Sequence, residues 1–446
     1  MSNNKFMPFS DKVKGSLYGM LVGDAVAVPG HWFYSPKNLR ADYGEITGMV
    51  APKPTHAESM VQGMSYNGTI DILHDKAHFY EGNNLAKQAQ EVKSKEVMEA
   101  LRDDHGNFVG KTAKERVHYH QSLLAGQNTV NACIARLAMR YLGEINAGGQ
   151  DNYHPDEFLD KLYKYMVTPP DPKDKAQLVN HNDTYLDVYL REFFTNASKG
   201  KPLRDCTLSQ RDSWSIGSID GVAMCIPMIA AYANEPEWYV VGRAIEHAHL
   251  THRSITVTAC LAALVPLLLD LYRQEETDDA ASRLRSALDK VMEKMAPPKL
   301  TGSEMRYSYI NNKGPGNIPK DIKWMQHMNL DKSESTKDFV HRMMEFINDE
   351  DVAGYGDRPD SRLSTACYCE QTFTVVLYLA YKYASDPRKA LLQNVMLGGH
   401  STSRGAVLGS IFGAAYGMEG IPFQDELCAK EAIEKEVTNL VANIIA

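Results

Sequence analysis

The sequence predicts an all-α fold in a single large domain. Segments with apolar residues at helical spacing recur along the 446 residues, and the sequence shows no series of short alternating strands joined by hairpin turns. Apolar residues make up 43% of the chain, which is typical of a folded globular protein rather than a disordered one. We therefore expect a compact bundle of many helices over residues 1–446.

Helices are expected where apolar side chains fall on one face. Residues 132–142 place Ile134, Leu137 and Tyr141 on one side of a helix. The longest apolar stretch, residues 255–269, is shorter than the roughly 20 residues of a membrane span. It also contains Pro266, so we expect a buried core helix there. The same pattern predicts helices at residues 222–232, 240–249, 372–383 and 405–416.

Two segments lack this periodicity and are expected to be insertions. They cover about residues 51–120, rich in His, Lys, Glu and Gly, and about residues 297–360, which contain Pro-Pro and Gly-Pro-Gly. Long loops in a compact domain are usually functional lids or solvated excursions. Neither segment has the apolar pattern of an independent domain, so one domain is predicted.

Glycine recurs at every fourth position near both ends of the chain, as Gly15, Gly19 and Gly23 and as Gly405, Gly409, Gly413 and Gly417. Residues four apart lie on one face of a helix. Each interior glycine costs a helix about 1 kcal/mol relative to alanine. Such stripes are tolerated best where another backbone approaches closely. We therefore expect the first and last of these helices to be buried and tightly packed, with each other as candidate partners.

Charge and cysteine content limit the classes of function. Lys and Arg total 48 against 56 Asp and Glu, a net charge of −8, which argues against a general nucleic-acid binder. Residues 1–10 hold no apolar segment of the kind found in secretory signals. Seven scattered cysteines favour reduced thiols in a reducing compartment. We expect a cytoplasmic protein that binds neither nucleic acid nor a membrane.

Five segments, in order, resemble those of the ADP-ribosylglycohydrolases, the family that includes the dinitrogenase reductase activating glycohydrolase. They are residues 15–25 (GSLYGMLVGDA), 35–48 (SPKNLRADYGEITG), 217–224 (GSIDGVAM), 250–252 (LTH) and 397–405 (LGGHSTSRG). The resemblance covers most of the chain outside the two insertions. It implies a compact all-α bundle and hydrolysis of the bond between ADP-ribose and an arginine or serine side chain.

The resemblance also implies two Mg²⁺ ions, held by a Thr-Asp-Asp near the start of an early helix and an Asp-Thr-Asp-Thr after the closing Gly-Gly. This sequence departs from both segments. In the first, only Thr129 remains, since the aspartates are replaced by Val130 and Asn131. In the second, residues 400–403 read His-Ser-Thr-Ser. Hard divalent ions rarely bind without protein carboxylates, so we expect no metal ligands and no cofactor.

Two other positions of the resemblance have changed. His31 stands where the family often has an acid, and Asp220 stands where it usually has Asn. Glycosidic cleavage needs a proton donor and a base, so the candidate catalytic residues are Asp220, His31 and His400. The alternatives are a helix cap for Asp220 and a hydrogen-bonded loop histidine for His31.

Further polar residues are candidates for binding a substrate. Arg404 and His400 lie at an expected helix start, whose free N–H groups also attract anions, so together they could bind an anionic group of a substrate. An equal alternative is that they form a cap or an ion pair on the surface. Asp24 more simply satisfies buried backbone donors. The full candidate set is Asp24, Thr129, Asn131, Glu370, Gly399, Ser401, Ser403 and Arg404.

Other histidines offer weaker signals. The segment 246–252 (EHAHLTH) lacks the spacing of zinc proteases. The polar clusters at residues 118–120 and 181–185 could border a substrate cleft, but solvated loops are the expected arrangement.

The predicted function is hydrolysis of an N- or O-glycosidic, ribosyl-type bond in a small nucleotide or other anionic substrate, without the dinuclear magnesium site. The alternative is an inactive pseudoenzyme that binds ADP-ribose or a related ligand, or a structural protein. Loss of the metal carboxylates favours the alternative. Replacement by ionisable side chains such as His31, His400 and Asp220 favours the hydrolase.

Overall fold

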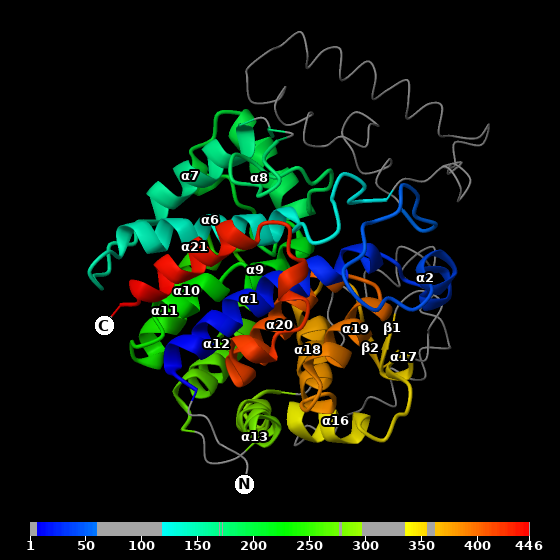
Figure 1. The fold of residues 1–446 in the computed structure, drawn as a ribbon. Coiled ribbons are helices and arrows are strands. Elements are labelled where there is room, and N and C mark those ends of the chain that lie inside the picture. The colour runs from blue at the N-terminus through cyan, green and yellow to red at the C-terminus, as the bar shows by residue number, and fades with distance from the viewer. Residues whose placement is uncertain are drawn as a thin grey trace, which may run out of the picture.

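The computed structural model describes residues 7–59, 118–168, 170–171, 173–275, 279–296, 335–354 and 362–445. Its centre is a pair of helices, α1 (Phe9–Ala27) and α20 (Ser401–Tyr416), which lie side by side in Figure 1. Their glycines meet in antiparallel order, with Gly15 opposite Gly413, Gly19 opposite Gly409, and Gly23 opposite Gly405. The expectation that the two glycine-striped helices pack on each other is confirmed.

The glycines are needed because the two backbones touch. A Cβ atom on Gly19 would lie 2.0 Å from the carbonyl oxygen of Gly409, and one on Gly23 would lie 1.9 Å from that of Gly405. Any side chain at these positions would force the helices apart. Almost all of α20 is buried, and its only charged residue is Arg404.

The helices around this pair include every one predicted from periodicity, and the all-α class is confirmed. The predicted helix 222–232 is divided into α9 (Asp220–Ala223) and α10 (Ile226–Ala231). Pro227 lies in the first turn of α10, where its missing N–H is tolerated, so a new helix begins there. The remaining helices are α2 (Pro36–Tyr43), α6 (Val130–Ile145), α7 (Pro155–Val167), α8 (Val188–Ser198), α11 (Glu237–Ala248), α12 (Ile255–Arg273), α13 (Ala280–Met292), α16 (Thr336–Met343), α17 (Asp349–Val352), α18 (Cys369–Lys382), α19 (Pro387–Met396) and α21 (Lys430–Ala442).

Strand structure in the described ranges is confined to β1 (Ala353–Gly354) and β2 (Leu363–Ser364), which form a short parallel pair. Most of the two predicted insertions lies outside the described residues. Of the second, α16 is described, and its Phe339 and Val340 are buried in the core. This part of the segment is therefore packed into the bundle.

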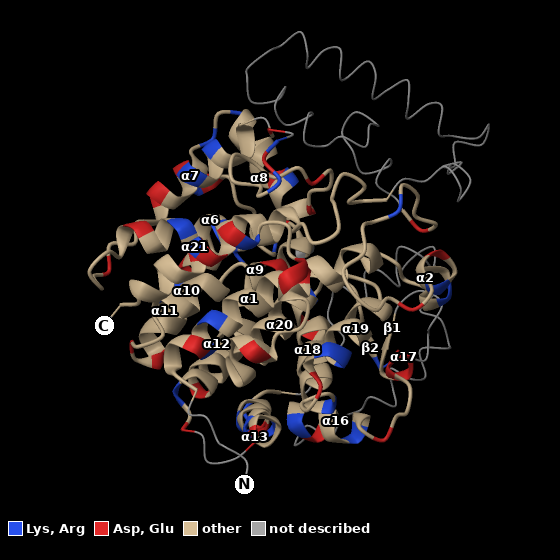
Figure 2. Cartoon of the chain, in the orientation of Figure 1, with Lys and Arg blue, Asp and Glu red and all other residues tan. Residues whose placement is uncertain are grey.

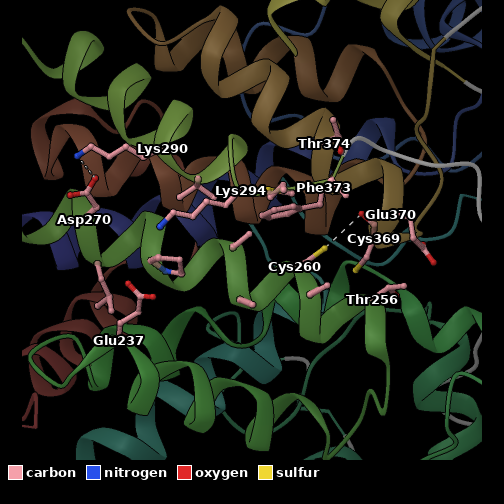
Figure 3. A pocket seen from close by; sticks show the side chains of 18 of the residues that line it. Glu237, Thr256, Cys260, Asp270, Lys290, Lys294, Cys369, Glu370, Phe373 and Thr374 are labelled. Carbon is pink, nitrogen blue, oxygen red and sulfur yellow. Dashed lines mark hydrogen bonds and ion pairs between the residues drawn. The ribbon is translucent and has the colours of Figure 1, made fainter. Parts of the chain in front are cut away.

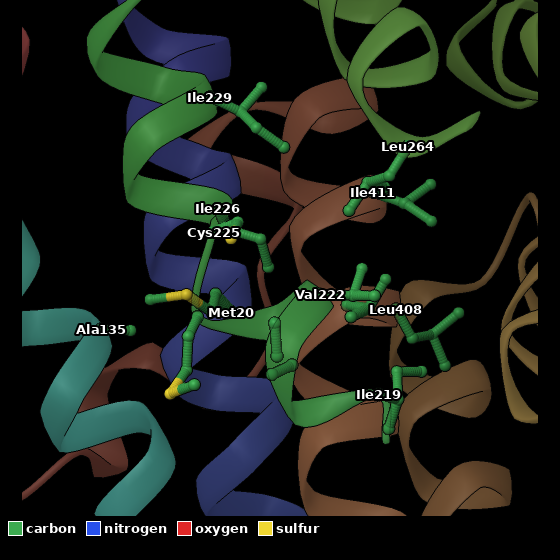
Figure 4. Close-up of a cluster of buried hydrophobic side chains, with 14 of the residues drawn as sticks. Met20, Ala135, Ile219, Val222, Cys225, Ile226, Ile229, Leu264, Leu408 and Ile411 are labelled. Atoms are coloured by element: carbon green, nitrogen blue, oxygen red, sulfur yellow. The ribbon is translucent and has the colours of Figure 1, made fainter. Parts of the chain in front are cut away.

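The core lies between the central pair and helices α6, α9, α10 and α12. Figure 4 shows apolar side chains from all of these helices converging on one region. The labelled side chains are Met20, Ala135, Ile219, Val222, Cys225, Ile226, Ile229, Leu264, Leu408 and Ile411. Charged residues gather instead on the outer helices, such as α7, α13 and α16 (Figure 2).

Helix α12 is the one helix of the described chain that is long and apolar enough to cross a membrane. In the structure, 61% of its apolar window is buried inside the protein, which is the position expected of a core helix.

Candidate functional site

Asp220, the first residue of α9, is the centre of a buried polar cluster. Its Oδ1 atom accepts hydrogen bonds from His400 Nε2 at 2.5 Å, Ser403 Oγ at 2.6 Å and Asn131 Nδ2 at 3.0 Å. Its Oδ2 atom accepts one from Ser218 Oγ at 2.7 Å. Asp220 and His400 are 1% and 0% exposed. The carboxylate makes no helix-capping bond, since Ile219 occupies the N-cap position, so the capping alternative is wrong.

A second carboxyl group, Asp187, belongs to the same cluster and escaped the sequence analysis. Asn131 Nδ2 donates to both acids, to Asp187 Oδ2 at 2.9 Å and to Asp220 Oδ1 at 3.0 Å. On its other side, Asn131 Oδ1 accepts a hydrogen bond from the Tyr189 hydroxyl at 2.5 Å. Asp187, Asp220 and His400 place polar atoms within 4.8 Å of one another.

The pKa values of the two carboxyl groups are shifted in opposite directions. Burial and, to a smaller extent, the nearby charge of Asp220 together raise the pKa of Asp187 to about 7. Burial would also raise the pKa of Asp220, but the charge of His400 and the hydrogen bonds from His400 and Ser403 lower it to about 2. Burial alone would lower the pKa of His400, but the charge of Asp220, the hydrogen bond to Asp220 and the charge of Asp187 together raise it.

His31 also lies in this cluster, but between two other histidines. Its Nε2 atom is 3.0 Å from His400 Nδ1, and its Nδ1 atom is 2.5 Å from His120 Nε2. His120 Nδ1 in turn is 2.7 Å from Asp183 Oδ1. The prediction that His120 and Asp183 lie in solvated loops is wrong, because they are 1% and 0% exposed. Their polar atoms are paired with each other, which is what permits burial.

The start of α6, which carries Asn131, is held in place by Asp24. The Asp24 carboxylate accepts hydrogen bonds from the Thr129 hydroxyl at 2.6 Å, the Thr129 N–H at 2.9 Å and the Asn128 amide at 3.0 Å. The interpretation of Asp24 as a partner for buried backbone donors is thus confirmed. Thr129 points to Asp24 rather than to Asp220.

The start of α20, which carries His400 and Ser403, is held by Arg404. Its guanidinium, which is fully buried, donates to Asn394 Oδ1 and to the carbonyl oxygens of Asn394, Gly398 and Thr365. Burial lowers the pKa of Arg404 to about 9. Arg404 is therefore not on the surface, and its contact with an anionic ligand stays a prediction.

Two further candidates lie in the same turn. Gly399 has a φ of 62°, and a Cβ atom there would meet the Thr365 carbonyl oxygen at 2.2 Å. The Ser401 hydroxyl donates to the Ala27 carbonyl oxygen at 2.9 Å. Both residues shape the turn that delivers His400 to Asp220.

Glu370, the last candidate, lines a different region. It lies in the first turn of α18, at one end of a cavity of about 940 Å³ formed by the outer face of α12 together with α13 and α18 (Figure 3). Burial raises the pKa of Glu370. The groups that bond Asp220 do not line this cavity.

The residues of this cluster do not fit the two magnesium ions that the resemblance implies. The Thr129 hydroxyl is engaged by Asp24, Val130 has no ligand atom in its side chain, and Asn131 turns its amide nitrogen toward both acids. His400 Nε2 and Asp220 Oδ1 are in direct hydrogen-bond contact, which leaves no space for an ion between them. Hydrogen-bond donors thus occupy the directions from which cations would contact Asp220.

Comparisons with known proteins identify the family and the fold. The model of the ADP-ribosylglycohydrolase family matches residues 7–445. Among solved structures, a chain described as an ADP-ribosylglycohydrolase-related protein complex is similar, with a TM-score of 0.51 and 13% identity, over 98% of this chain and 99% of that one. No curated protein matches in sequence. Because the family model spans nearly the whole described bundle, the chain belongs to the ADP-ribosylglycohydrolase family, whose members are generally hydrolases.

Proposed function

We propose that the protein hydrolyses an N- or O-glycosidic bond of a ribosyl-type, anionic small molecule, and that it does so without a dinuclear magnesium site. The observation that carries the proposal is the buried pair Asp187 and Asp220, whose pKa values of about 7 and about 2 are driven apart. Paired carboxyl groups with separated pKa values are the usual basis of acid–base catalysis at a glycosidic bond.

The two acids have different roles in this proposal. At neutral pH Asp187 is partly protonated, so it can give a proton to the leaving group. Asp220 is ionised and provides the negative charge that stabilises a developing oxocarbenium ion, or that orients a water molecule. Asp187 is also the more accessible of the two, at 6% exposed against 1%.

The other members of the cluster position these acids. Asn131 bridges them, and His400 with Ser403 keeps Asp220 ionised. His31 contacts His400 rather than Asp220, so it acts through His400. No step requires a metal ion.

A ligand-binding pseudoenzyme is the second candidate, and one observation favours it. Asp220 already accepts four hydrogen bonds from the protein itself, and the side chains around it are almost completely buried. A carboxylate with four hydrogen bonds from the protein stabilises the fold, and it is less available to contact a substrate or a water molecule.

A turnover assay in the presence of EDTA separates the two candidates. ADP-ribosylated arginine and serine substrates are incubated with the wild type and with the Asp187→Asn and Asp220→Asn variants. We expect release of ADP-ribose that EDTA leaves intact and that each variant lowers by about 10²–10⁴-fold. Binding of ADP-ribose without turnover would instead establish the pseudoenzyme. Turnover that requires added Mg²⁺ would contradict both.

A further inference from the structure

Five buried groups are connected in a row by four hydrogen bonds, in the order Asp183, His120, His31, His400 and Asp220. The successive distances are 2.7 Å, 2.5 Å, 3.0 Å and 2.5 Å. All five residues are at most 1% exposed. The ring planes of His31 and His120 are nearly parallel, at 12° to each other, with centroids 4.8 Å apart. We refer to these five residues as the histidine chain.

Hydrogen-bond donors face both ends of the histidine chain. Asp183 accepts from the backbone N–H groups of Val130 at 3.0 Å and Tyr185 at 3.2 Å, and a backbone N–H is always a donor. Asp220 accepts from His400 Nε2, Ser403 Oγ and the Asn131 amide nitrogen on Oδ1, and from Ser218 Oγ on Oδ2. Donors on both oxygens of each carboxylate stabilise its ionised form, so we assign both carboxylates as ionised.

The number of protons in the histidine chain follows from counting. Each of the four hydrogen bonds contains one proton, and neither carboxylate supplies one. All four protons must then be on the three imidazole rings. Three neutral rings carry only three protons. The chain therefore contains one imidazolium ion.

The neighbouring histidines cannot supply this charge. His56 Nε2 donates to the His31 carbonyl oxygen, and His56 Nδ1 accepts from the Glu58 N–H. His118 Nε2 donates to the Pro29 carbonyl oxygen, and its Nδ1 accepts from the His120 N–H. Each of the two rings thus has one donor and one acceptor nitrogen, which is the neutral form.

We propose that His31, His120 and His400 form a proton relay that keeps one imidazolium ion beside the two acids of the site, with Asp183 as a positioning residue. The relay supplies a positive charge at the place where the family resemblance implies metal ions. Its role in catalysis rests on the proposed hydrolase function, whereas its protonation state does not. The other charged groups that interact with it include Asp187, Arg404 and Asp24.

The charge can move along the relay without any change in the number of protons. With the charge on His400, that ring holds protons on both nitrogens, and His31 and His120 each hold one on Nδ1. When the His400 Nδ1 proton moves to His31 Nε2, and the His31 Nδ1 proton moves to His120 Nε2, the charge is on His120. Only N–H bonds break and form. The two carboxylates favour charge on the end rings, and burial disfavours it on His31, whose pKa is lowered.

The test is nitrogen NMR of the whole protein labelled with ¹⁵N-histidine at pH 8, where an ordinary histidine is neutral. We expect one imidazolium in total over His31, His120 and His400, with signals assigned by single substitutions. The His31→Phe variant leaves two hydrogen bonds and two rings, so the same count predicts that His120 and His400 become neutral. His247→Phe, at a buried histidine that bonds Tyr153, is the matched control and should leave the relay signals unchanged.

Three neutral rings in the wild type would overturn the proposal, because a carboxyl proton would then complete the chain. An imidazolium that persists at His400 in His31→Phe would also overturn the relay, since the adjacent acids alone would account for the charge. If His31→Phe fails to fold, the wild-type spectrum still decides the count. A protein with the imidazolium but without turnover would refute the proposed function and leave the relay standing.

Discussion

Replacement of Asp187 by Asn should remove a large, pH-dependent decrease in the free energy of unfolding. The pKa of Asp187 is raised from 3.8 to about 7, chiefly by burial. Between these values the folded protein holds a proton that the unfolded chain has released. The free energy of unfolding therefore falls as pH rises through this window, by about 1.4 kcal/mol per pH unit. Over the whole window the loss reaches about 4 kcal/mol, all of it present above pH 7.

Urea unfolding, followed by tryptophan fluorescence at pH 4, 5.5, 7 and 8, measures this effect. We expect the stability of Asp187→Asn relative to the wild type to increase by about 4 kcal/mol from pH 4 to pH 8. The Asp220 pKa of about 2 acts below this window and does not compete. Asp160→Asn, on the exposed face of α7, is the control and should keep the wild-type profile. Parallel pH profiles for Asp187→Asn and the wild type would refute the assignment of Asp187.

Three further predictions concern packing, a buried ion pair and pH. Gly19→Ala should destabilise the protein by about 3 kcal/mol or more, because the new Cβ atom would meet the backbone of α20. Gly242 on α11 has open space around it, so Gly242→Ala is the control and should be neutral or stabilising by up to about 1 kcal/mol. Thermal unfolding measures both changes. Glu436→Gln should cost about 3–5 kcal/mol, since it leaves the buried guanidinium of Arg136 without its bidentate partner; a change below 1 kcal/mol would contradict this. Turnover should fall about tenfold per pH unit above pH 7, as Asp187 loses its proton, and a rate that rises there would exclude it as the acid.

The sequence was most informative where a pattern has one physical meaning. Glycines at every fourth position can be explained only by close approach of another surface, and α1 and α20 do touch there. The sequence also predicted that His31, His400 and Asp220 come together, because the segments that carry these residues begin or end at α1, α20 and α9.

The sequence could not show which polar loop residues are buried. His120, Asp183 and Asp187 lie in segments without apolar periodicity, and such segments are usually solvated. Their burial depends on partners far away in the chain, such as His31 for His120 and Asn131 for Asp187. The spacing of two aspartates four residues apart, just before α8, was the only local signal.

The central claim is that protein groups, rather than a pair of metal ions, complete the site around Asp220. Calorimetric titration of the protein with Mg²⁺ tests it most directly. The account predicts no tight binding and no shift of the melting temperature with added Mg²⁺ or EDTA. Tight uptake of two Mg²⁺ ions, lost in Asp220→Asn, would contradict it.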